Sequence, residues 1–183
     1  MASSDAELLE QWRNGDRKAG QALFRRYYET LERFFINKVP GDIADFVQET
    51  LRRCLEGRDR IADGSKFRSY LFSVAHNVLR NHFRNKVRHG IALDLDEVTV
   101  QELAPGPRSV LAERDEQRLL LQALRTIPVT DQVILELRYW EALTDPEIAE
   151  VLGVPLGTAK GRMNRARRRL ETKLRALTSP PEH

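Results

Sequence analysis

The sequence has a single cysteine, Cys54, and it lacks any apolar run of the roughly 20 residues that a membrane-spanning helix needs. No internal disulfide is therefore possible, which is typical of proteins in a reducing cytosol. Residues 1–16 contain neither a basic start nor a long apolar stretch, so they do not resemble a signal peptide. We therefore expect a cytoplasmic protein that does not insert into a membrane.

Sequence patterns of catalytic and metal sites are also lacking. There is no glycine-rich phosphate loop, no GxSxG motif and no Ser-His-Asp order. His76, His82 and His89 are spaced by six and seven residues, which matches no usual metal site, and no cysteine lies close to them. We expect neither an enzyme activity nor a metal ion or other cofactor.

Charged residues are 31% of the chain, and they are unevenly distributed although the formal net charge is only +3. Residues 156–175 hold eight basic side chains and one acid, and residues 58–89 hold eight basic side chains and two acids. In contrast, residues 129–155 hold six acids and one arginine. Two basic segments on an otherwise balanced chain indicate two contacts with a polyanion.

Apolar residues recur at helical spacing almost throughout, and no segment alternates convincingly as a strand would. A short helix should follow Ser4, and Asp42 is a candidate cap for a later helix whose buried stripe includes Cys54 and Leu55. Residues 57–66 are typical of a loop, and a long helix should begin near its end. The pattern predicts an all-α protein.

The helical pattern stops between about Gly90 and Pro107, where four acids and a Pro-Gly-Pro sequence indicate an extended acidic linker. We therefore predict two small helical domains joined by this linker. The predicted division is a first domain of residues 1–90, a linker of 91–108, a second domain of 109–178 and a tail of 179–183.

The sharpest motif lies in residues 144–175. Thr144 and Glu147 are spaced as a capping box, and Gly153 suits a tight left-handed turn before a basic helix. This order predicts a helix-turn-helix, whose second helix enters the DNA major groove. A solvated basic helix is the alternative, but the turn, the capping box and the matched apolar stripes favour DNA binding. The expected contacts lie on the outer face of the second helix: Thr158, Lys160, Arg162, Arg165 and Arg168.

A second polar strip lies on the long helix that follows the 57–66 loop. Its members share one helical face because they are offset from the first by four, seven, eleven and fifteen residues. They are Ser73, Asn77, Arg80, Arg84 and Arg88. The strip is mostly cationic and about four turns long.

With these segments identified, the chain resembles a bacterial extracytoplasmic-function sigma factor, a group 4 member of the sigma-70 family. LFRRYYETLERFF resembles the family's first conserved helix, and DIADFVQETLRRC is similar to its core-polymerase-binding segment. FRSYLFSVAHNVLRNHFR resembles its promoter −10 segment, and the stretch from LRTIPVTDQ to NRARRRL resembles its −35-binding domain. The four segments occur in the family's order over nearly the whole length.

The resemblance implies a subunit that directs core RNA polymerase to promoters and melts the −10 element, and it implies an anti-sigma factor as a control partner. The implied polymerase contacts are Asp45, Gln48, Glu49 and Arg52. The 57–66 loop would take a base flipped from the −10 element, which costs a few kcal/mol. The implied −10 contacts are Ser65, Lys66, Phe67, Asn77, Arg80, Arg84 and Arg88. Stacking on bases and packing in the core are both open for Phe67 and Tyr70, and core packing is favoured.

Four residues depart from the family's common pattern and leave open which promoter bases are read. They are Tyr70, His76, Asn81 and Gly161, which stand where the family commonly has Trp, Arg, Asp and Ser, respectively. Two alternative functions also remain open. One is a freestanding helix-turn-helix regulator that acts without polymerase, and the other is an adaptor whose N-terminal helices bind only proteins.

Overall fold

The computed structural model describes residues 3–36, 38–39, 41–61, 63–87, 96–99 and 115–178. Over these ranges the chain is mostly helical, with one isolated β-bridge between Thr99 and Pro128 and no strand, which confirms the all-α prediction. The α-helices are α1 (Asp5–Arg13), α2 (Arg17–Ile36), α3 (Ile43–Gly57), α4 (Phe67–Val87), α6 (Asp115–Arg125), α7 (Val129–Tyr139), α8 (Asp145–Leu152) and α9 (Leu156–Thr178). The 3-10 helices η1 (Arg58–Arg60) and η2 (Gly64–Lys66) lie between α3 and α4. None of the described helices is both long and apolar enough to span a bilayer.

Helices α1 to α4 form the first domain, and the expected capping residues begin two of them. The Ser4 hydroxyl accepts a hydrogen bond from the backbone N–H of Glu7 at 3.2 Å, and the Glu7 carboxylate accepts one from the Ser4 N–H at 2.8 Å. Asp42 caps α3 by accepting a hydrogen bond from the Ala44 N–H at 2.9 Å. These caps satisfy backbone donors that the first turn leaves free, so they fix where each helix begins.

The segment expected to be a loop between α3 and α4 is held in place by short-range contacts. The Asp63 carboxylate accepts hydrogen bonds from the N–H and the hydroxyl of Ser65, at 2.9 and 2.6 Å, and these lower the pKa of Asp63. A Cβ added to Gly64 would lie 2.6 Å from the Cα of Ala6, so glycine permits a close approach to α1. The loop is therefore anchored on the first domain at η2.

Helices α6 to α9 form the second domain, which contains the expected helix-turn-helix in α8 and α9. The Glu147 carboxylate accepts hydrogen bonds from the N–H and the hydroxyl of Thr144, at 2.7 and 2.6 Å, and so closes the capping box. Gly153 ends α8 with a φ of 65°, in the left-handed region that favours glycine. Ala149 and Ala159 are buried, which allows the two helices to approach closely.

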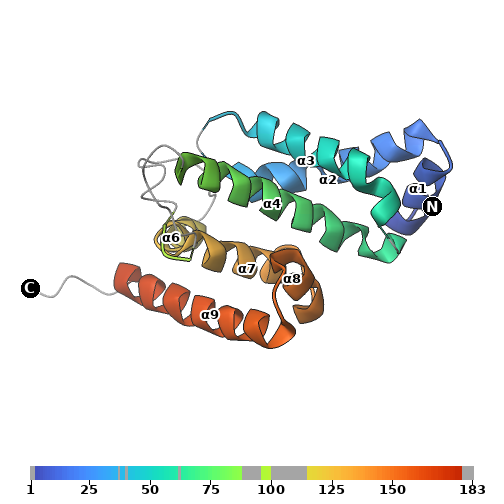
Figure 1. The fold of residues 1–183 in the computed structure, drawn as a ribbon. Helices are drawn as coiled ribbons and strands as arrows, with labels where there is room; N and C mark the ends of the chain where they lie inside the picture. The colour runs from blue at the N-terminus through green and yellow to red at the C-terminus, as the bar shows by residue number, and fades with distance from the viewer. Residues whose placement is uncertain are drawn as a thin grey trace, which may run out of the picture.

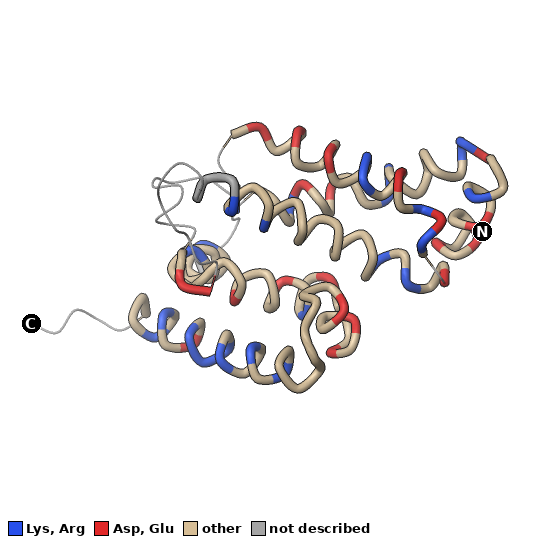
Figure 2. Tube along the Cα trace, in the orientation of Figure 1, with Lys and Arg blue, Asp and Glu red and all other residues tan. Residues whose placement is uncertain are grey.

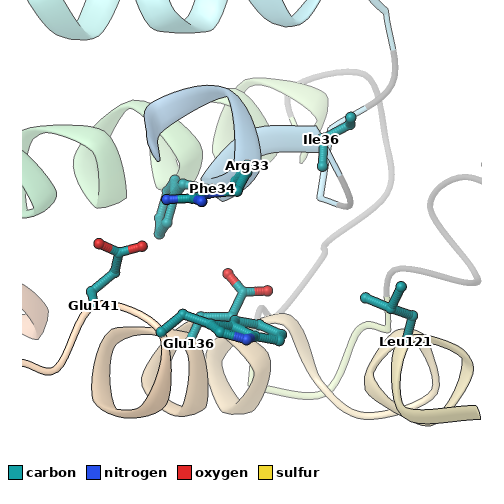
Figure 3. A pocket seen from close by; sticks show the side chains of 7 residues that line it. Arg33, Phe34, Ile36, Leu121, Glu136 and Glu141 are labelled. Carbon is teal, nitrogen blue, oxygen red and sulfur yellow. The ribbon is translucent and has the colours of Figure 1, made fainter. Parts of the chain in front are cut away.

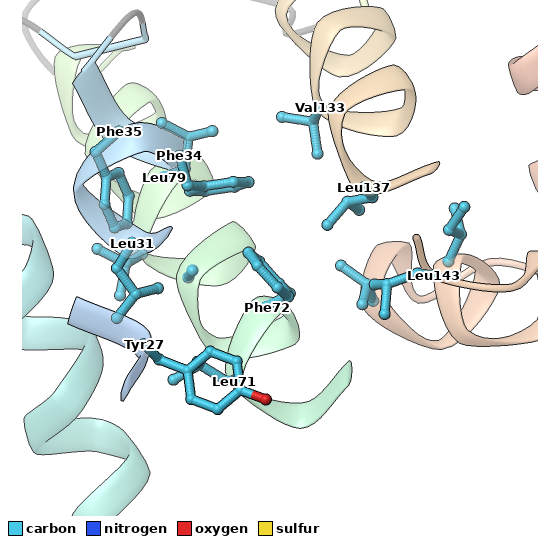
Figure 4. Packing of buried hydrophobic residues seen from close by; sticks show 14 of the residues in the cluster. Tyr27, Leu31, Phe34, Phe35, Leu71, Phe72, Leu79, Val133, Leu137 and Leu143 are labelled. Atoms are coloured by element: carbon cyan, nitrogen blue, oxygen red, sulfur yellow. The ribbon is translucent and has the colours of Figure 1, made fainter. Parts of the chain in front are cut away.

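The two domains pack directly against each other, with α4 lying along α8. In Figure 1, α3 and α9 lie at opposite edges of the molecule, and α4, α7 and α8 lie between them. A single cluster of buried apolar side chains extends through both domains. Figure 4 shows Phe72 of α4 pointing toward Leu137 of α7 and Leu143, across the boundary between the domains. The linker prediction is only partly within the described residues, where the Val98 carbonyl accepts a hydrogen bond from the Val129 N–H at 2.9 Å.

Candidate polymerase and nucleic-acid interfaces

The first candidate interface is the outer face of α3, at one edge of the molecule. This face carries all four side chains expected to bind polymerase: Asp45, Gln48, Glu49 and Arg52. Arg52 donates hydrogen bonds to both Glu49 oxygens at 2.9 Å and also pairs with Glu56. Hydrogen bonds from Arg52 and then Arg53 lower the pKa of Glu49 to about 2, so its carboxylate is charged at neutral pH. The face thus presents a fixed pattern of both charge signs, as polar protein interfaces do.

The buried stripe expected for α3 is wrong at one position, Leu55. The sequence places Leu55 beside Cys54 in the buried stripe, but its side chain is 47% exposed. Because positions 48, 52 and 55 are three to four residues apart, Leu55 shares the face of Gln48 and Arg52. Helical spacing, applied strictly, would have found this apolar addition to the polar face.

The second candidate interface comprises η2 and the exposed strip of α4. Five of the expected −10 contacts have exposed side chains on these elements: Ser65, Lys66, Asn77, Arg80 and Arg84. Arg84 donates a hydrogen bond to the Asn81 Oδ1 at 3.1 Å, which orients the guanidinium along the helix. Arg88, the last expected member of the strip, lies outside the described residues.

Phe67, one of the implied −10 contacts, does not lie on this surface but in the core, which is the alternative that the sequence favours. Its side chain is fully buried, and its ring centroid lies 5.6 Å from that of Tyr27. Burying a ring of this size in the core is strongly favourable, so the first residue of α4 serves as an anchor between α2 and α4. The other aromatic candidate, Tyr70, remains half-buried.

A pocket of about 240 Å³ lies between the 57–66 loop and α4, where the resemblance implies a site for a flipped base. Its first-domain wall is formed by Arg60, Ile61, Lys66, Ser69, Tyr70 and Ser73. A seventh residue, Glu150, comes from α8 of the second domain. The wall combines cationic, hydroxyl and aromatic groups, which suit the phosphate and the face of a nucleotide.

The third candidate interface is the outer half of α9, at the edge of the molecule opposite α3 (Figure 1). Four of the five expected −35 contacts are exposed there: Thr158, Lys160, Arg165 and Arg168. The fifth, Arg162, is 26% exposed and lies 3.6 Å from the Asp96 carboxylate at the edge of this face. Asn164 is also exposed, between Lys160 and Arg168, and it is absent from the contacts expected from the sequence. An asparagine can read adenine through two hydrogen bonds.

Ionic contacts join the domains through the acidic segment of α7 and α8. Lys38, which follows α2 and is fully buried, pairs with Glu136 of α7. Burial lowers the pKa of Lys38 and raises that of Glu136, while their mutual attraction acts in the opposite direction. Arg68 of α4 also pairs with Glu141 at 3.0 Å. Figure 2 shows the acidic segments of α7 and α8 beside the basic start of α4.

A cavity of about 360 Å³ lies next to these pairs, between the two domains (Figure 3). Its lining includes residues of α2 on one side and residues of α6, α7 and the following turn on the other: Arg33, Phe34, Ile36, Leu121, Glu136, Trp140 and Glu141. Trp140 is 52% exposed, so an indole ring is left partly uncovered at the rim. The domain contact is therefore incompletely filled.

His76, which stands where the family commonly has Arg, faces the second domain. It is 6% exposed and forms a hydrogen bond with the backbone of Val151 in α8. Burial, and then the charge of Arg80, lower the pKa of His76 to about 4, so the ring is neutral at pH 7. Local sequence patterns could not indicate this contact, because Val151 is 75 residues from His76 along the chain.

The remaining candidate chemistry is sparse in the part of the chain that the structure describes. No three His, Cys, Asp or Glu side chains there are grouped so that they could hold a metal ion. Cys54 is buried, and burial raises the pKa of its thiol to about 12. His89, the third histidine considered as a metal ligand from the sequence, lies outside the described residues.

The chain matches two family models, one in each of its two helical domains. The description "Sigma-70 region 2" matches residues 22–89, which include α3 and α4, and "Sigma-70, region 4" matches residues 117–170, which include the helix-turn-helix. Together the two matches cover two-thirds of the chain. The chain belongs to the sigma-70 family.

Curated relatives identify the branch of the family. The chain is 25% identical to the ECF RNA polymerase sigma-E factor of Escherichia coli K12, over 95% of this chain and 96% of the relative. It is also 25% identical to the sigma-E factor of Haemophilus influenzae, over 95% of this chain and 97% of the relative. The chain is thus an RNA polymerase sigma factor of the extracytoplasmic-function (ECF) type, and a freestanding regulator is not favoured.

Solved structures share the fold of this sigma factor. CnrH in complex with the cytosolic domain of CnrY has a TM-score of 0.66 and 23% identity, covering 95% of this chain and 99% of that chain. RpoE of Bartonella quintana, in complex with the anti-sigma factor NepR, has a TM-score of 0.66 and 22% identity, covering 85% and 96%. The two-domain helical architecture is therefore common to all three proteins.

Proposed function

We propose that this sigma factor binds core RNA polymerase through the outer face of α3, binds the −35 duplex through α9, and melts the −10 element with η2 and α4. The observation that carries the proposal is that one chain presents all three exposed surfaces within the matched region 2 and region 4 segments. Residues 1–90 would form the region 2 domain, 91–108 the linker and 109–178 the region 4 domain.

The chemistry of each surface supports its assigned partner. Arg165 and Arg168 on α9 can neutralise phosphates or bond guanine edges in the major groove. Asn77 and Arg80 on α4 offer donors to an unpaired strand, and such contacts can offset the cost of extruding a base. Both DNA contacts are small, so polymerase would join them by holding both domains on one promoter. We therefore expect the free protein to bind promoter DNA poorly.

The proposed partners are core RNA polymerase, promoter DNA and an anti-sigma factor. RpoE of Bartonella quintana is described in complex with an anti-sigma factor, and it has the same fold. The protein would act in the cytoplasm, where polymerase is, and would itself catalyse no reaction. Polymerase would carry out all the chemistry of RNA synthesis.

Run-off transcription with core polymerase tests the proposal. Purified protein, core enzyme and a library of promoter fragments should yield transcripts that neither protein gives alone. The combined substitution Asp45→Asn and Glu49→Gln should reduce transcription at least ~tenfold, because it removes two charges from a polar protein interface. Binding of −35 duplex by the same variant should stay unchanged, because α9 is at the opposite edge of the molecule.

The matched control is Glu29→Gln, which removes an exposed carboxylate from α2 rather than α3. It should leave transcription unchanged. Specific footprints without polymerase, combined with no transcripts when polymerase is present, would favour the freestanding regulator. Full activity of the Asp45/Glu49 variant would refute the assignment of α3 to polymerase.

A further inference from the structure

The cavity between the two domains belongs to none of the three proposed interfaces. Its volume of about 360 Å³ lies within the range of small-molecule sites, roughly 300–1,000 Å³, and such sites occur preferentially where domains meet. Arg33, Ile36 and Trp140 have exposed side chains in its lining, so a solute can enter it from the solvent. The cavity therefore has the size and the access that a small ligand needs.

Two carboxylates of the second domain face this cavity. In Figure 3, Glu136 and Glu141 point from the second domain toward Phe34 of α2. Both residues are nearly buried, at 6% and 8% exposure. Burial and, to a smaller extent, the charge of Glu141 raise the pKa of Glu136, so the two carboxylates repel each other. A cation in the cavity would relieve this repulsion.

One alkylammonium group is already bound beside the cavity, and it comes from the chain itself. The Lys38 ammonium pairs with Glu136 and lies 4.6 Å from the centre of the Phe34 ring, and both of these partners line the cavity. A carboxylate and an aromatic face together can hold a cation away from water. The Lys38 contact is therefore an internal example of the chemistry that this site can bind.

Glu141 and Trp140 supply the same two kinds of group a second time, on adjacent residues of the lining. The Glu141 Oε2 accepts a hydrogen bond from Arg68 at 3.0 Å, but its Oε1 forms no hydrogen bond with a described residue. The only basic side chain among the described lining residues is Arg33, which is exposed and donates a hydrogen bond to the Thr30 hydroxyl at 3.2 Å. The buried part of the lining thus offers carboxylate oxygens and an aromatic ring.

We propose that this cavity binds a small organic amine, a protonated ammonium group on an apolar body. Glu141 pairs with the ammonium group, and the charge of Glu136 adds to the attraction. The apolar body packs against Trp140, Leu121 and Ile36. An uncharged apolar solute would leave the Glu141 oxygen without a donor, and an anionic one would add a third negative charge beside two carboxylates.

A bound amine contacts both domains, because α2 supplies Phe34 and Ile36 while the second domain supplies Leu121 and Glu141. It therefore binds the closed arrangement, in which the two domains are packed, more tightly than separated domains. By linkage, occupancy of the cavity stabilises the closed arrangement. The concentration of an amine would thus influence how firmly the two domains of the sigma factor are held together.

Titration calorimetry of the full-length protein with three matched probes tests the proposal. Phenethylamine, hydrocinnamate and phenethyl alcohol share a phenylethyl body and carry an ammonium group, a carboxylate and a hydroxyl group. Phenethylamine should bind at least about tenfold more tightly than the other two, because it alone can form an ion pair with Glu141. Equal affinity for the three probes, or no heat with phenethylamine at millimolar concentration, would overturn the proposal.

Variants of the lining identify the groups that bind the amine. Glu141→Gln keeps the shape of the side chain but removes its charge, so it should weaken phenethylamine binding at least about tenfold. Trp140→Leu removes the aromatic face and should weaken binding about threefold. Glu150→Gln is the matched control, because Glu150 pairs with Lys66 across the domain contact but does not line the cavity. It should change the Kd less than twofold, and a loss equal to that of Glu141→Gln would refute the site.

A second measurement locates the amine in the wild-type protein. The chain has two tryptophans, and their indole N–H groups give separate NMR signals. Trp140 lines the cavity, whereas Trp12 is buried in the first domain and serves as the reference. Phenethylamine should shift the Trp140 signal, identified by its loss in Trp140→Leu, and leave the Trp12 signal in place. Binding in the calorimeter without a shift of Trp140 would place the amine elsewhere, and the inference would be wrong.

Discussion

Lys38 and Glu136 are 98 residues apart in the sequence, yet they form an ion pair buried between the two domains. The Lys38 ammonium also donates to the Phe34 carbonyl at 2.6 Å and lies 4.6 Å from the centre of the Phe34 ring. Gln132 donates a hydrogen bond to the other Glu136 oxygen at 2.8 Å. Both charges are therefore well satisfied, as buried charges must be.

Removing one member of this pair should open the domains. Lys38→Met leaves the Glu136 carboxylate buried without its cation, which costs about 3 kcal/mol or more. Separation of the domains relieves that cost, so the radius of gyration from small-angle X-ray scattering should increase. Helix content by circular dichroism should stay the same. The added change Glu136→Leu should restore closure, and unchanged scattering of Lys38→Met would contradict the role of the pair.

Acid should also open the domains, through His76. Its pKa is about 4 in the closed protein, below the ordinary value of 6.5, so the open form binds more protons between these values. The closed state of the two domains is most stable above pH 6.5, where His76 is neutral in both states. That stabilisation is lost as the pH falls toward 4, because the open form takes up a proton on His76 and the closed form does not. Between pH 7 and pH 5 the loss is about 2 kcal/mol. Scattering at both pH values measures it.

His76→Gln is the control for this pH dependence. The charges that act on His76 are Arg80 from its own helix, Arg162 from α9 and Asp96 from the linker, and the Gln variant keeps them all. Glu136, whose pKa is raised, favours closure in acid and so acts in the opposite direction. The difference between wild type and variant therefore isolates His76. Equal pH profiles of the two proteins would rule out this role.

The −35 contact should depend on salt through single arginines of α9. Arg165 is exposed and forms no ion pair with a described residue, so its charge is available to a phosphate. Arg165→Ala should lower the slope of log K against log salt for −35 duplex by about one. Arg25→Ala, an exposed change on α2, should leave the slope as it is. A slope unaffected by Arg165→Ala would place the phosphate contact elsewhere.

Two glycines of the helix-turn-helix should respond to alanine with opposite signs. Gly153 has a φ of 65° and open space around it, so Gly153→Ala adds only backbone strain, of about 1–2 kcal/mol. Gly161 lies within α9, also in open space, and Gly161→Ala should stabilise the helix by up to about 1 kcal/mol. Thermal unfolding should therefore shift down for Gly153→Ala and up for Gly161→Ala. A shift of the same sign in both would contradict these backbone assignments.

Local signals in the sequence were enough to predict much of the fold. Ser4, Asp42 and Gly153 act on backbone groups within a few residues, so their effects can be read without knowing the tertiary structure. Two roles stayed open for Phe67, because an aromatic residue at a helix start can face either a core or a ligand. Its contact with Tyr27 decides the matter, and that contact is 40 residues distant.

The closed arrangement was beyond sequence reasoning for a different reason. The acidic character of residues 129–155 was visible, but its partner was not. Pairing Arg68 with Glu141 or Lys38 with Glu136 requires the distance between two domains, and no periodicity encodes it. The roles assigned to individual DNA and polymerase contacts stay predictions until the variants are measured.

Cys54 is buried inside the first domain, and burial raises the pKa of its thiol, so the thiol stays protonated at neutral pH. Alkylating reagents attack the thiolate at accessible positions, so this native thiol will not compete for a maleimide or nitroxide at neutral pH. Surface cysteines introduced one per domain would then take the labels alone. Spectroscopic rulers can thus follow the two halves of the molecule as they part on polymerase, without altering Cys54.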